Sequence, residues 1–365
     1  MTGGCSMHFY MPVRVFDERD CVLRHAKDIA RLGKKALIVT GKSSSRKNGS
    51  LDDVMAALEA EHVEHLLFSE VEENPSTETV LRARDLFSDS GIDLVIGVGG
   101  GSALDAAKAV ALVLKHPGAD LSYLYDATKD ASALPVVCVP TTCGTGSEVT
   151  GVSVLTRHDK RTKISMVHKI FPVLALVDGK YLKNAPAELI VNTSVDALAH
   201  LYESVLNAKA DDYTRMTASA GLRCWAKTKE ILTKERTASQ EDLDLLMRSS
   251  LLAGMSIAQS GTSLPHALSY ALTYDLALPH GKAVGIFLPA FLKAAPEAER
   301  DELLQLAGFS GLAEFAAFIG GLFGGTEVPE EERRRTFEMV AGNAAKMKSA
   351  SFPVDEKVLE TIAFG

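Results

Sequence analysis

The chain has 365 residues, of which 46% are hydrophobic, and a formal net charge of −8 at neutral pH. Its length and composition allow a large buried core and predict two domains. The negative charge and the lack of Lys/Arg clusters beyond short runs such as 333–335 argue against a nucleic-acid-binding protein.

The N-terminal segment 1–10 lacks the basic and apolar regions of a signal peptide, and no apolar run reaches ~18 residues. We therefore expect a cytoplasmic protein. The five cysteines are odd in number, scattered and free of any C-x-x-C pair, which predicts reduced thiols and gives no support for a thiolate metal site. They are Cys5, Cys21, Cys138, Cys143 and Cys224.

The first half alternates short apolar runs with amphipathic stretches, a pattern typical of a parallel sheet wrapped by helices. Predicted strands are 36–40, 65–69, 94–98 and 136–139, and predicted helices are 51–61 and 77–87. Ser50 and Asp53 form a candidate capping box, which predicts that the first of these helices starts there.

The first strand-to-helix turn, 41–47, reads Gly-Lys-Ser-Ser-Ser-Arg-Lys and has no carboxylate. An acidic side chain at this point would bind a ribose 2′-hydroxyl, whereas a basic, hydroxyl-rich loop accommodates a 2′-phosphate. The candidate cofactor residues here are Gly41, Lys42, Ser43 and Ser44, and they favour NADP(H) over NAD(H). The alternative is a surface loop without a ligand.

Two further loops follow predicted strands. Segment 97–108, Gly-Val-Gly-Gly-Gly-Ser-Ala-Leu-Asp-Ala-Ala-Lys, opens a helix and can present backbone N–H groups to a pyrophosphate, although Ser102 stands where a third glycine is usual. A tight turn with no ligand is the alternative. Segment 140–148, Pro-Thr-Thr-Cys-Gly-Thr-Gly-Ser-Glu, adds four hydroxyls at the end of the next strand, which suits a nucleotide or a nicotinamide amide.

From Pro186 onward the periodicity is helical, as in 243–257 and 312–323. The sequence therefore predicts a Rossmann-like α/β dinucleotide-binding domain over residues 1–185 and an all-α, metal-binding domain over residues 186–365.

Asp196 and His200 are four residues apart on a helical pattern and share one face, although alone such a pair more often forms a surface hydrogen bond.

His266 and His280 lie in the almost uncharged segment 263–281. An unbroken helix would separate them by ~21 Å, so a shared metal requires a break, for which Pro279 and Gly281 are candidates. Two separate structural histidines are the alternative. Together, one carboxylate and three imidazoles suit Fe²⁺ or Zn²⁺, and the lack of a thiolate favours iron.

Four motifs, in their order along the chain, resemble those of a known enzyme family. They are 99–108 (Gly-Gly-Gly-Ser-Ala-Leu-Asp-Ala-Ala-Lys), 141–150 (Thr-Thr-Cys-Gly-Thr-Gly-Ser-Glu-Val-Thr), Asp196-x-x-x-His200, and His266 with Leu-Pro-His-Gly at 278–281. In this order they resemble the iron-containing (group III) alcohol dehydrogenases, in particular the 1,3-propanediol and butanol dehydrogenase-like members.

The resemblance implies a dehydroquinate synthase-like architecture, a homodimer and a role for each matching residue. Asp196, His200, His266 and His280 would bind divalent iron. The cofactor would be held by Gly99, Gly100 and Ser102 at the pyrophosphate, by Asp105 and Lys163 around it, and by Thr141, Thr142, Thr145 and Ser147 on the nicotinamide side. Members that prefer NAD have an acidic residue at the position of Gly41, in agreement with the loop chemistry.

One departure concerns proton transfer. Many members have a second histidine four residues beyond the third metal ligand, where this chain has Tyr270. Tyr270 would take over part of that role, or protons would leave through water and the cofactor ribose. The expected activity is hydride transfer between NAD(P) and a small primary alcohol or diol, or the corresponding aldehyde. The alternatives are a glycerol dehydrogenase-like or dehydroquinate synthase-like enzyme and a catalytically silent nucleotide-binding sensor.

Overall fold

The structure, a computed structural model, describes residues 7–365, so Cys5 and most of the segment inspected for a signal peptide lie outside the described residues. The chain divides into two compact units. One is Pro12–Pro186, and the other comprises Ala187–Gly365 together with residues 7–11. Within the described residues, no helix combines the length and apolar composition needed to cross a lipid bilayer.

The first unit is built on a six-stranded sheet in the order β1-β8-β5-β4-β2-β3, with all neighbouring strands parallel. The four predicted strands are present as β2 to β5. The strands of this sheet are β1 (Arg14–Asp17), β2 (Lys35–Gly41), β3 (Glu64–Val71), β4 (Leu94–Gly99), β5 (Val136–Pro140) and β8 (Leu174–Val177). A separate antiparallel hairpin, β6 (Val154–Arg157) and β7 (Thr162–Ser165), was not predicted.

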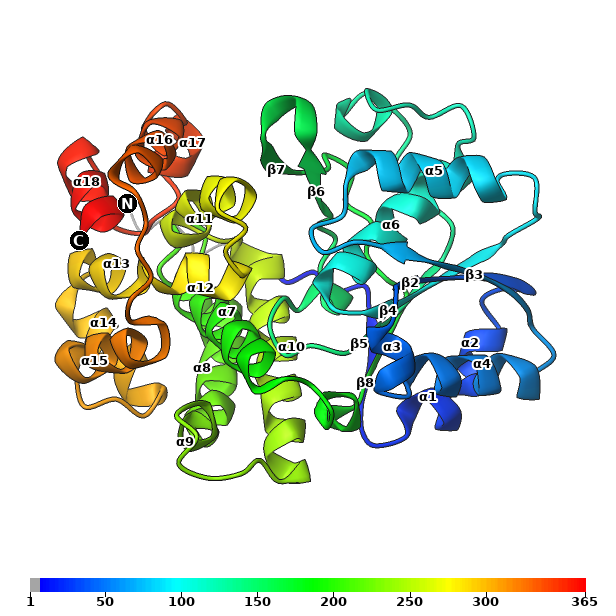
Figure 1. The fold of residues 1–365 in the computed structure, drawn as a ribbon, viewed down its shortest axis with the longest axis horizontal. Coiled ribbons are helices and arrows are strands. Elements are labelled where there is room, and N and C mark those ends of the chain that lie inside the picture. The colour runs from blue at the N-terminus through cyan, green and yellow to red at the C-terminus, as the bar shows by residue number, and fades with distance from the viewer. Residues whose placement is uncertain (1–6) are drawn as a thin grey trace. The chain divides into compact units, whose positions relative to one another are not determined.

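Helices cover both faces of the sheet, because alternate side chains of each strand point to opposite sides and both sets are apolar (Figure 1). Leu37 and Val95 pack under α5 (Thr77–Phe87) and α6 (Gly101–Lys115). Ile38 and Ile96 pack on the opposite layer. That layer contains α1 (Cys21–Arg24), α2 (Ala26–Ala30) and α4 (Ser50–Ala60). The prediction of a Rossmann-like α/β domain is confirmed.

The predicted capping box at the start of α4 is wrong. The residue that precedes the helix is Gly49, in the left-handed region at φ +82°, and the side-chain oxygen of Asn48 accepts the backbone N–H of Ser50 (3.0 Å). The carboxylate of Asp53 instead accepts a hydrogen bond from the hydroxyl of Tyr181 (2.8 Å) and pairs with the ammonium of Lys180 (2.9 Å). The Asp53 carboxylate, which the capping box would have used at the helix start, is therefore bound by Lys180 and Tyr181.

The second unit is helical, as predicted, and α7 (Ala187–Val205) packs against α8, α10, α11 and α12. The predicted helices at 243–257 and 312–323 are confirmed as parts of α10 and as α15. The other helices are α8 (Asp212–Ala226), α9 (Lys229–Leu232), α10 (Gln240–Ser260), α11 (Leu264–Asp275), α12 (His280–Gly285), α13 (Leu288–Ala294), α14 (Glu297–Leu306), α15 (Leu312–Phe323), α16 (Glu330–Ala341), α17 (Ala344–Met347) and α18 (Glu356–Phe364). Because α7 is buried from Ser194 to Val205, its polar side chains in that stretch face protein rather than water.

Candidate metal centre and cofactor loops

Helix α7 presents two of the predicted ligands side by side. Asp196 and His200 are one turn apart on the same face, as the 3.6-residue period requires. Their side chains are only 4% and 7% exposed. A carboxylate and an imidazole at this depth need partners, because a buried polar group without one costs free energy.

The other two ligands come from helices separated by the predicted break. Helix α11 carries His266 and ends at Asp275, and Ala277 turns the chain in the left-handed region at φ +51°. Pro279 then precedes α12, whose first residue is His280. The break therefore lies just before Pro279.

Gly281 lies inside α12 rather than at the turn, and it is required for a different reason. A Cβ on this residue would lie 1.7 Å from the backbone carbonyl oxygen of Asn192 on α7. Only a residue without a side chain lets α12 approach α7 this closely. The contact therefore fixes the position of the neighbouring His280.

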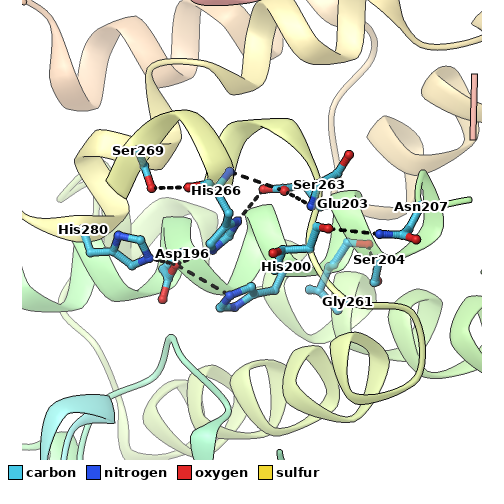
Figure 2. A network of polar contacts seen from close by, with 12 residues as sticks. Asp196, His200, Glu203, Ser204, Asn207, Gly261, Ser263, His266, Ser269 and His280 are labelled. Atoms are coloured by element: carbon cyan, nitrogen blue, oxygen red, sulfur yellow. Dashed lines mark hydrogen bonds and ion pairs between the residues drawn. The ribbon is translucent and has the colours of Figure 1, made fainter. Parts of the chain in front are cut away.

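The three imidazoles converge on one carboxylate oxygen of Asp196 (Figure 2). The Nε2 atoms of the three histidines lie 3.3 Å (His266), 3.7 Å (His280) and 4.0 Å (His200) from Oδ1 of Asp196. The last two distances are too long for hydrogen bonds. They suit ligands that surround one ion, since bonds of 2.0–2.1 Å place tetrahedral donors roughly 3.4 Å apart.

The donor atoms of Asp196, His200 and His266 also lie within 4.8 Å of one another, so these three form the compact part of the set. The fourth, His280, adjoins it through Asp196 and is the most exposed, at 22%. The donor set therefore fits a divalent metal.

The electrostatics of the cluster favour a cation. Burial opposes ionisation of Asp196, but the imidazoles, His200 first, prevail and hold the pKa of this carboxyl well below its usual range. Burial also opposes the charge on His266, but the Glu203 carboxylate prevails and raises the pKa of His266 to about 9. A metal that binds here must displace the proton on Nε2 of His266, the nitrogen that faces Asp196, so metal binding depends on pH.

Glu203 is a site residue that the sequence analysis missed. Its side chain is fully buried, and its Oε1 lies 2.5 Å from Nδ1 of His266 (Figure 2). A signal was available, because Glu203 follows Asp196 by seven residues and therefore lies on the same face of α7.

In the other unit, the three predicted cofactor loops follow the neighbouring strands β2, β4 and β5 at their carboxyl ends, where parallel sheets bind ligands. The backbone N–H of Thr141 donates to the carbonyl of Gly99 at 2.9 Å and joins two of the loops. Among the described residues no side chain caps the start of α6 at Gly100. The first N–H groups of that helix are therefore suited to an anion.

Several predicted cofactor residues hold the loops themselves. The Ser102 hydroxyl accepts the backbone N–H of Asn74 at 3.0 Å. Asp105 accepts hydrogen bonds from the Ser147 hydroxyl and from the backbone N–H of Val154. Thr141 is buried, Thr142 and Thr145 are half-buried, and Lys163 lies on β7. Thr142 and Thr145 are therefore the more accessible of the three threonines, and the Thr145 hydroxyl accepts the backbone N–H of Ser147 (3.3 Å).

Lys108 is the second residue that sequence reasoning missed, although it ends the glycine motif. Its ammonium is fully buried, and it donates to the hydroxyl of Ser147 (2.7 Å) and to the carbonyls of Ser147 (3.1 Å), Thr150 (3.3 Å) and Val152. It also pairs with Asp105 at 3.0 Å. One buried cation thus fastens α6 to the loop that follows β5.

Glu148 lies in the same loop, with 2% of its surface exposed. Burial raises the pKa of Glu148 to about 7, although the nearby charge of Lys108 opposes the shift. The folded protein therefore holds a proton on this carboxyl that the unfolded chain would release at a lower pH.

Comparison with known proteins places this geometry in a family. The chain matches the family models described as Iron-containing alcohol dehydrogenase over residues 12–179 and as Fe-containing alcohol dehydrogenase family, C-terminal, over residues 190–347. A solved structure of an iron-containing alcohol dehydrogenase from Thermotoga maritima is 37% identical, with a TM-score of 0.90 over 97% of this chain and 98% of the other. The chain belongs to the iron-containing alcohol dehydrogenase family.

Curated relatives of this iron-containing alcohol dehydrogenase are more distant. The NADPH-dependent butanol dehydrogenase of Clostridium saccharobutylicum is 29% identical over 77% of this chain and 73% of its own length. The 1,3-propanediol dehydrogenase of Citrobacter freundii is 30% identical over 76% and 72%. The match to aldehyde-alcohol dehydrogenase 2 of Entamoeba histolytica, at 29% identity, covers 78% of this chain but only 34% of that longer protein.

Two further residues that the sequence analysis singled out, Tyr270 and Gly41, lie at the edges of these sites. Tyr270, one turn beyond His266 on α11, is half-buried, and its ring is stacked on His280 with centroids 6.1 Å apart and planes inclined by 17°. Gly41 ends β2, and a Cβ there would lie 3.4 Å from the carbonyl of Val71, a contact that needs at most a small adjustment. After it, Lys42, Ser43 and Ser44 are exposed.

The Gly281 contact generates a prediction about metal binding. Gly281→Ala should push α12 away from α7 and lower the affinity for a divalent metal at least about 10-fold, because it displaces His280. Competition with a coloured chelator measures that affinity. Gly320→Ala, where an added Cβ meets nothing within 4 Å, is the matched control and should bind metal like the wild type. Equal affinities in all three proteins would contradict this role of Gly281.

The Glu148 carboxyl predicts a pH dependence of stability. Its pKa is about 7 in the folded state against 4.5 for an unperturbed carboxyl. The unfolding free energy should therefore fall as the pH rises from 4.5 to 7, by roughly 3 kcal/mol. Glu148→Gln lacks this loss, so its stability relative to the wild type should increase by about that amount between pH 4.5 and 8. Urea denaturation followed by circular dichroism tests this, with the exposed Glu64→Gln as control.

Proposed function

We propose that this protein is an iron-dependent, NAD(P)-linked dehydrogenase that interconverts a small primary alcohol or diol and its aldehyde, with NADP favoured. The net reaction is alcohol + NADP⁺ → aldehyde + NADPH + H⁺. The observation that carries the proposal is the convergence of three imidazole Nε2 atoms on the Asp196 carboxylate at metal-ligand spacing. Membership in the iron-containing alcohol dehydrogenase family supports it.

One set of residues would hold the metal, and a separate set would hold the nucleotide. Asp196, His200, His266 and His280 would hold the iron, and the one carboxylate offsets part of its charge. Bound iron supplies a Lewis acid for an alcohol or carbonyl oxygen. In the other unit, the N–H groups at the start of α6 would bind the pyrophosphate, and the half-buried Thr142 and Thr145 would offer hydroxyls to the nicotinamide side.

The preference for NADP rests on the end of β2. Gly41 has no carboxylate to bind a ribose 2′-hydroxyl, and Lys42, Ser43 and Ser44 offer a cation and two exposed hydroxyls to a 2′-phosphate. The names of relatives point both ways, since one butanol dehydrogenase is named NADPH-dependent and a methanol dehydrogenase of Bacillus methanolicus NAD-dependent, so the choice rests on this loop. A cytoplasmic homodimer stays a prediction from the sequence and the family resemblance.

The alternatives differ in chemistry. A glycerol dehydrogenase-like or dehydroquinate synthase-like enzyme would share the fold, and a panel of short alcohols, diols, glycerol and aldehydes separates it from the proposed activity. A silent nucleotide-binding sensor would bind the nucleotide but transfer no hydride after anaerobic iron loading. The complete set of four metal donors favours an enzyme over that sensor.

The first test is an anaerobic assay of the iron-reconstituted protein with short primary alcohols, 1,3-propanediol and the matching aldehydes. His266→Ala should lose bound iron and at least about 100-fold in kcat/KM together, because it removes a donor from the centre of the set. His116→Ala, a histidine of the α/β unit, is the control and should keep both. Full turnover by metal-free His266→Ala would refute the proposal.

The second test concerns the cofactor. The wild type should have a higher kcat/KM for NADP than for NAD. Gly41→Asp should reverse this preference by at least about 10-fold, since the new carboxylate binds the ribose 2′-hydroxyl and repels a 2′-phosphate. Gly41→Ala adds the Cβ without the charge and is the matched control. A wild type that prefers NAD, or treats both cofactors equally, would show that this loop does not select the 2′-phosphate.

A further inference from the structure

We infer that Glu203 is a positioning residue of the metal centre, which fixes the protonation pattern and the direction of the His266 ring so that its Nε2 is available to the metal. The inference rests on the proposed metal set and concerns how this chain prepares one of its four ligands. The Glu203 side chain would not itself contact the ion.

Both carboxylate oxygens of Glu203 are used, and they hold the same short segment (Figure 2). Oε1 faces Nδ1 of His266 at 2.5 Å. Oε2 accepts the backbone N–H of Ser263 at 2.6 Å and that of His266 at 3.5 Å. The opposite nitrogen of the ring, Nε2, faces Asp196 at 3.3 Å. Glu203 therefore fixes the backbone and one ring nitrogen of His266, and the other nitrogen points into the ligand set.

The hydrogen-bonding chemistry of the Glu203 carboxylate determines which ring nitrogen of His266 carries the proton. An ionised carboxylate only accepts hydrogen bonds, so the nitrogen that faces it must carry a proton. A neutral imidazole has one ring proton, and if it is on Nδ1 the lone pair is on Nε2. A carboxylate behind a ligating histidine also raises its basicity and fixes its orientation. Glu203 thus selects the tautomer of His266 that can bind a metal.

Glu203 has a second, structural role that a test must separate from the first. The side chain of Ser263 does not cap α11, and Glu203 from α7 instead accepts the N–H of Ser263, which precedes the helix, and the N–H of His266 in its first turn. A negative charge at a helix N-terminus is favourable. Loss of Glu203 should therefore lower stability as well as metal affinity, and stability alone does not distinguish the two roles.

The substitution Glu203→Gln separates them, because glutamine keeps the size but has one acceptor oxygen and one donor NH₂ group. If the NH₂ faces His266, Nδ1 must accept and the proton moves to Nε2, which can then no longer bind metal. If the oxygen faces His266, the NH₂ opposes the N–H groups of Ser263 and His266. Either orientation should weaken the site.

The experiment measures Zn²⁺ and Co²⁺ affinity by chelator competition, the visible spectrum of the Co²⁺ form and the melting temperature of the metal-free protein. Glu203→Gln should lose about 10- to 100-fold in affinity and change the Co²⁺ spectrum. Asp242→Asn is the matched control, because Asp242 is a buried carboxylate that completes the capping box of α10. It should lower the melting temperature and leave the affinity and spectrum unchanged. Wild-type affinity in Glu203→Gln would overturn the inference.

His266→Ala distinguishes this outcome from failure of the proposed metal set. If it binds Zn²⁺ as tightly as the wild type, the metal set itself is wrong. If only Glu203→Gln behaves like the wild type, the set stands and the inference fails. ¹⁵N NMR of histidine-labelled, Zn²⁺-loaded wild type covers the case in which Glu203→Gln does not fold. It should show His266, assigned by its absence in His266→Ala, with a proton on Nδ1 and none on Nε2. Any other protonation pattern would overturn the inference.

Discussion

The proposed metal centre depends on a helical framework that keeps a buried carboxylate and three imidazoles at a distance from one another. Without restraint, such groups would collapse into hydrogen bonds at 2.7–3.2 Å, because buried polar atoms need partners. Two of the three histidines instead stay 3.7 and 4.0 Å from Asp196. The side-chain-free contact at Gly281 and the carboxylate of Glu203 hold two of the rings, so the backbone and neighbouring side chains restrain the ligand set.

The α/β unit uses a buried ion for a comparable purpose. The ammonium of Lys108 binds four oxygens of the loop after β5 and pairs with Asp105, so one cation shapes a loop that has little regular structure of its own. Removing either partner of such a pair would leave an uncompensated buried charge. The motif residues Asp105 and Ser147 therefore contribute to the cofactor loops by fixing their shape.

Periodicity predicted much of this fold, because β2 to β5, α5, α10 and α15 each have a local apolar pattern long enough to identify. The short strands β6 and β7 have only four residues each, too few to show a clear alternation. The predicted cap of α4 is wrong for another reason. Lys180 and Tyr181, more than 120 residues away in the sequence, bind the carboxylate of Asp53. The types of metal ligand and the break between the histidines could be predicted. Glu203, which orients His266, and Lys108, which holds the loop after β5, act mainly through contacts distant in sequence.

Tyr270 stands where the family resemblance led us to expect a second histidine. His280 is the most exposed of the four proposed ligands, and the Tyr270 ring is stacked against it. An imidazole can take up a proton at one nitrogen and release another from the opposite nitrogen, whereas a phenol has a single oxygen for both tasks. Proton exchange beside His280 would therefore have to pass through one oxygen atom or through water. Tyr270 lies beside the proposed ligand set rather than in it, so a tyrosine here would change the route of the proton without changing the metal donors.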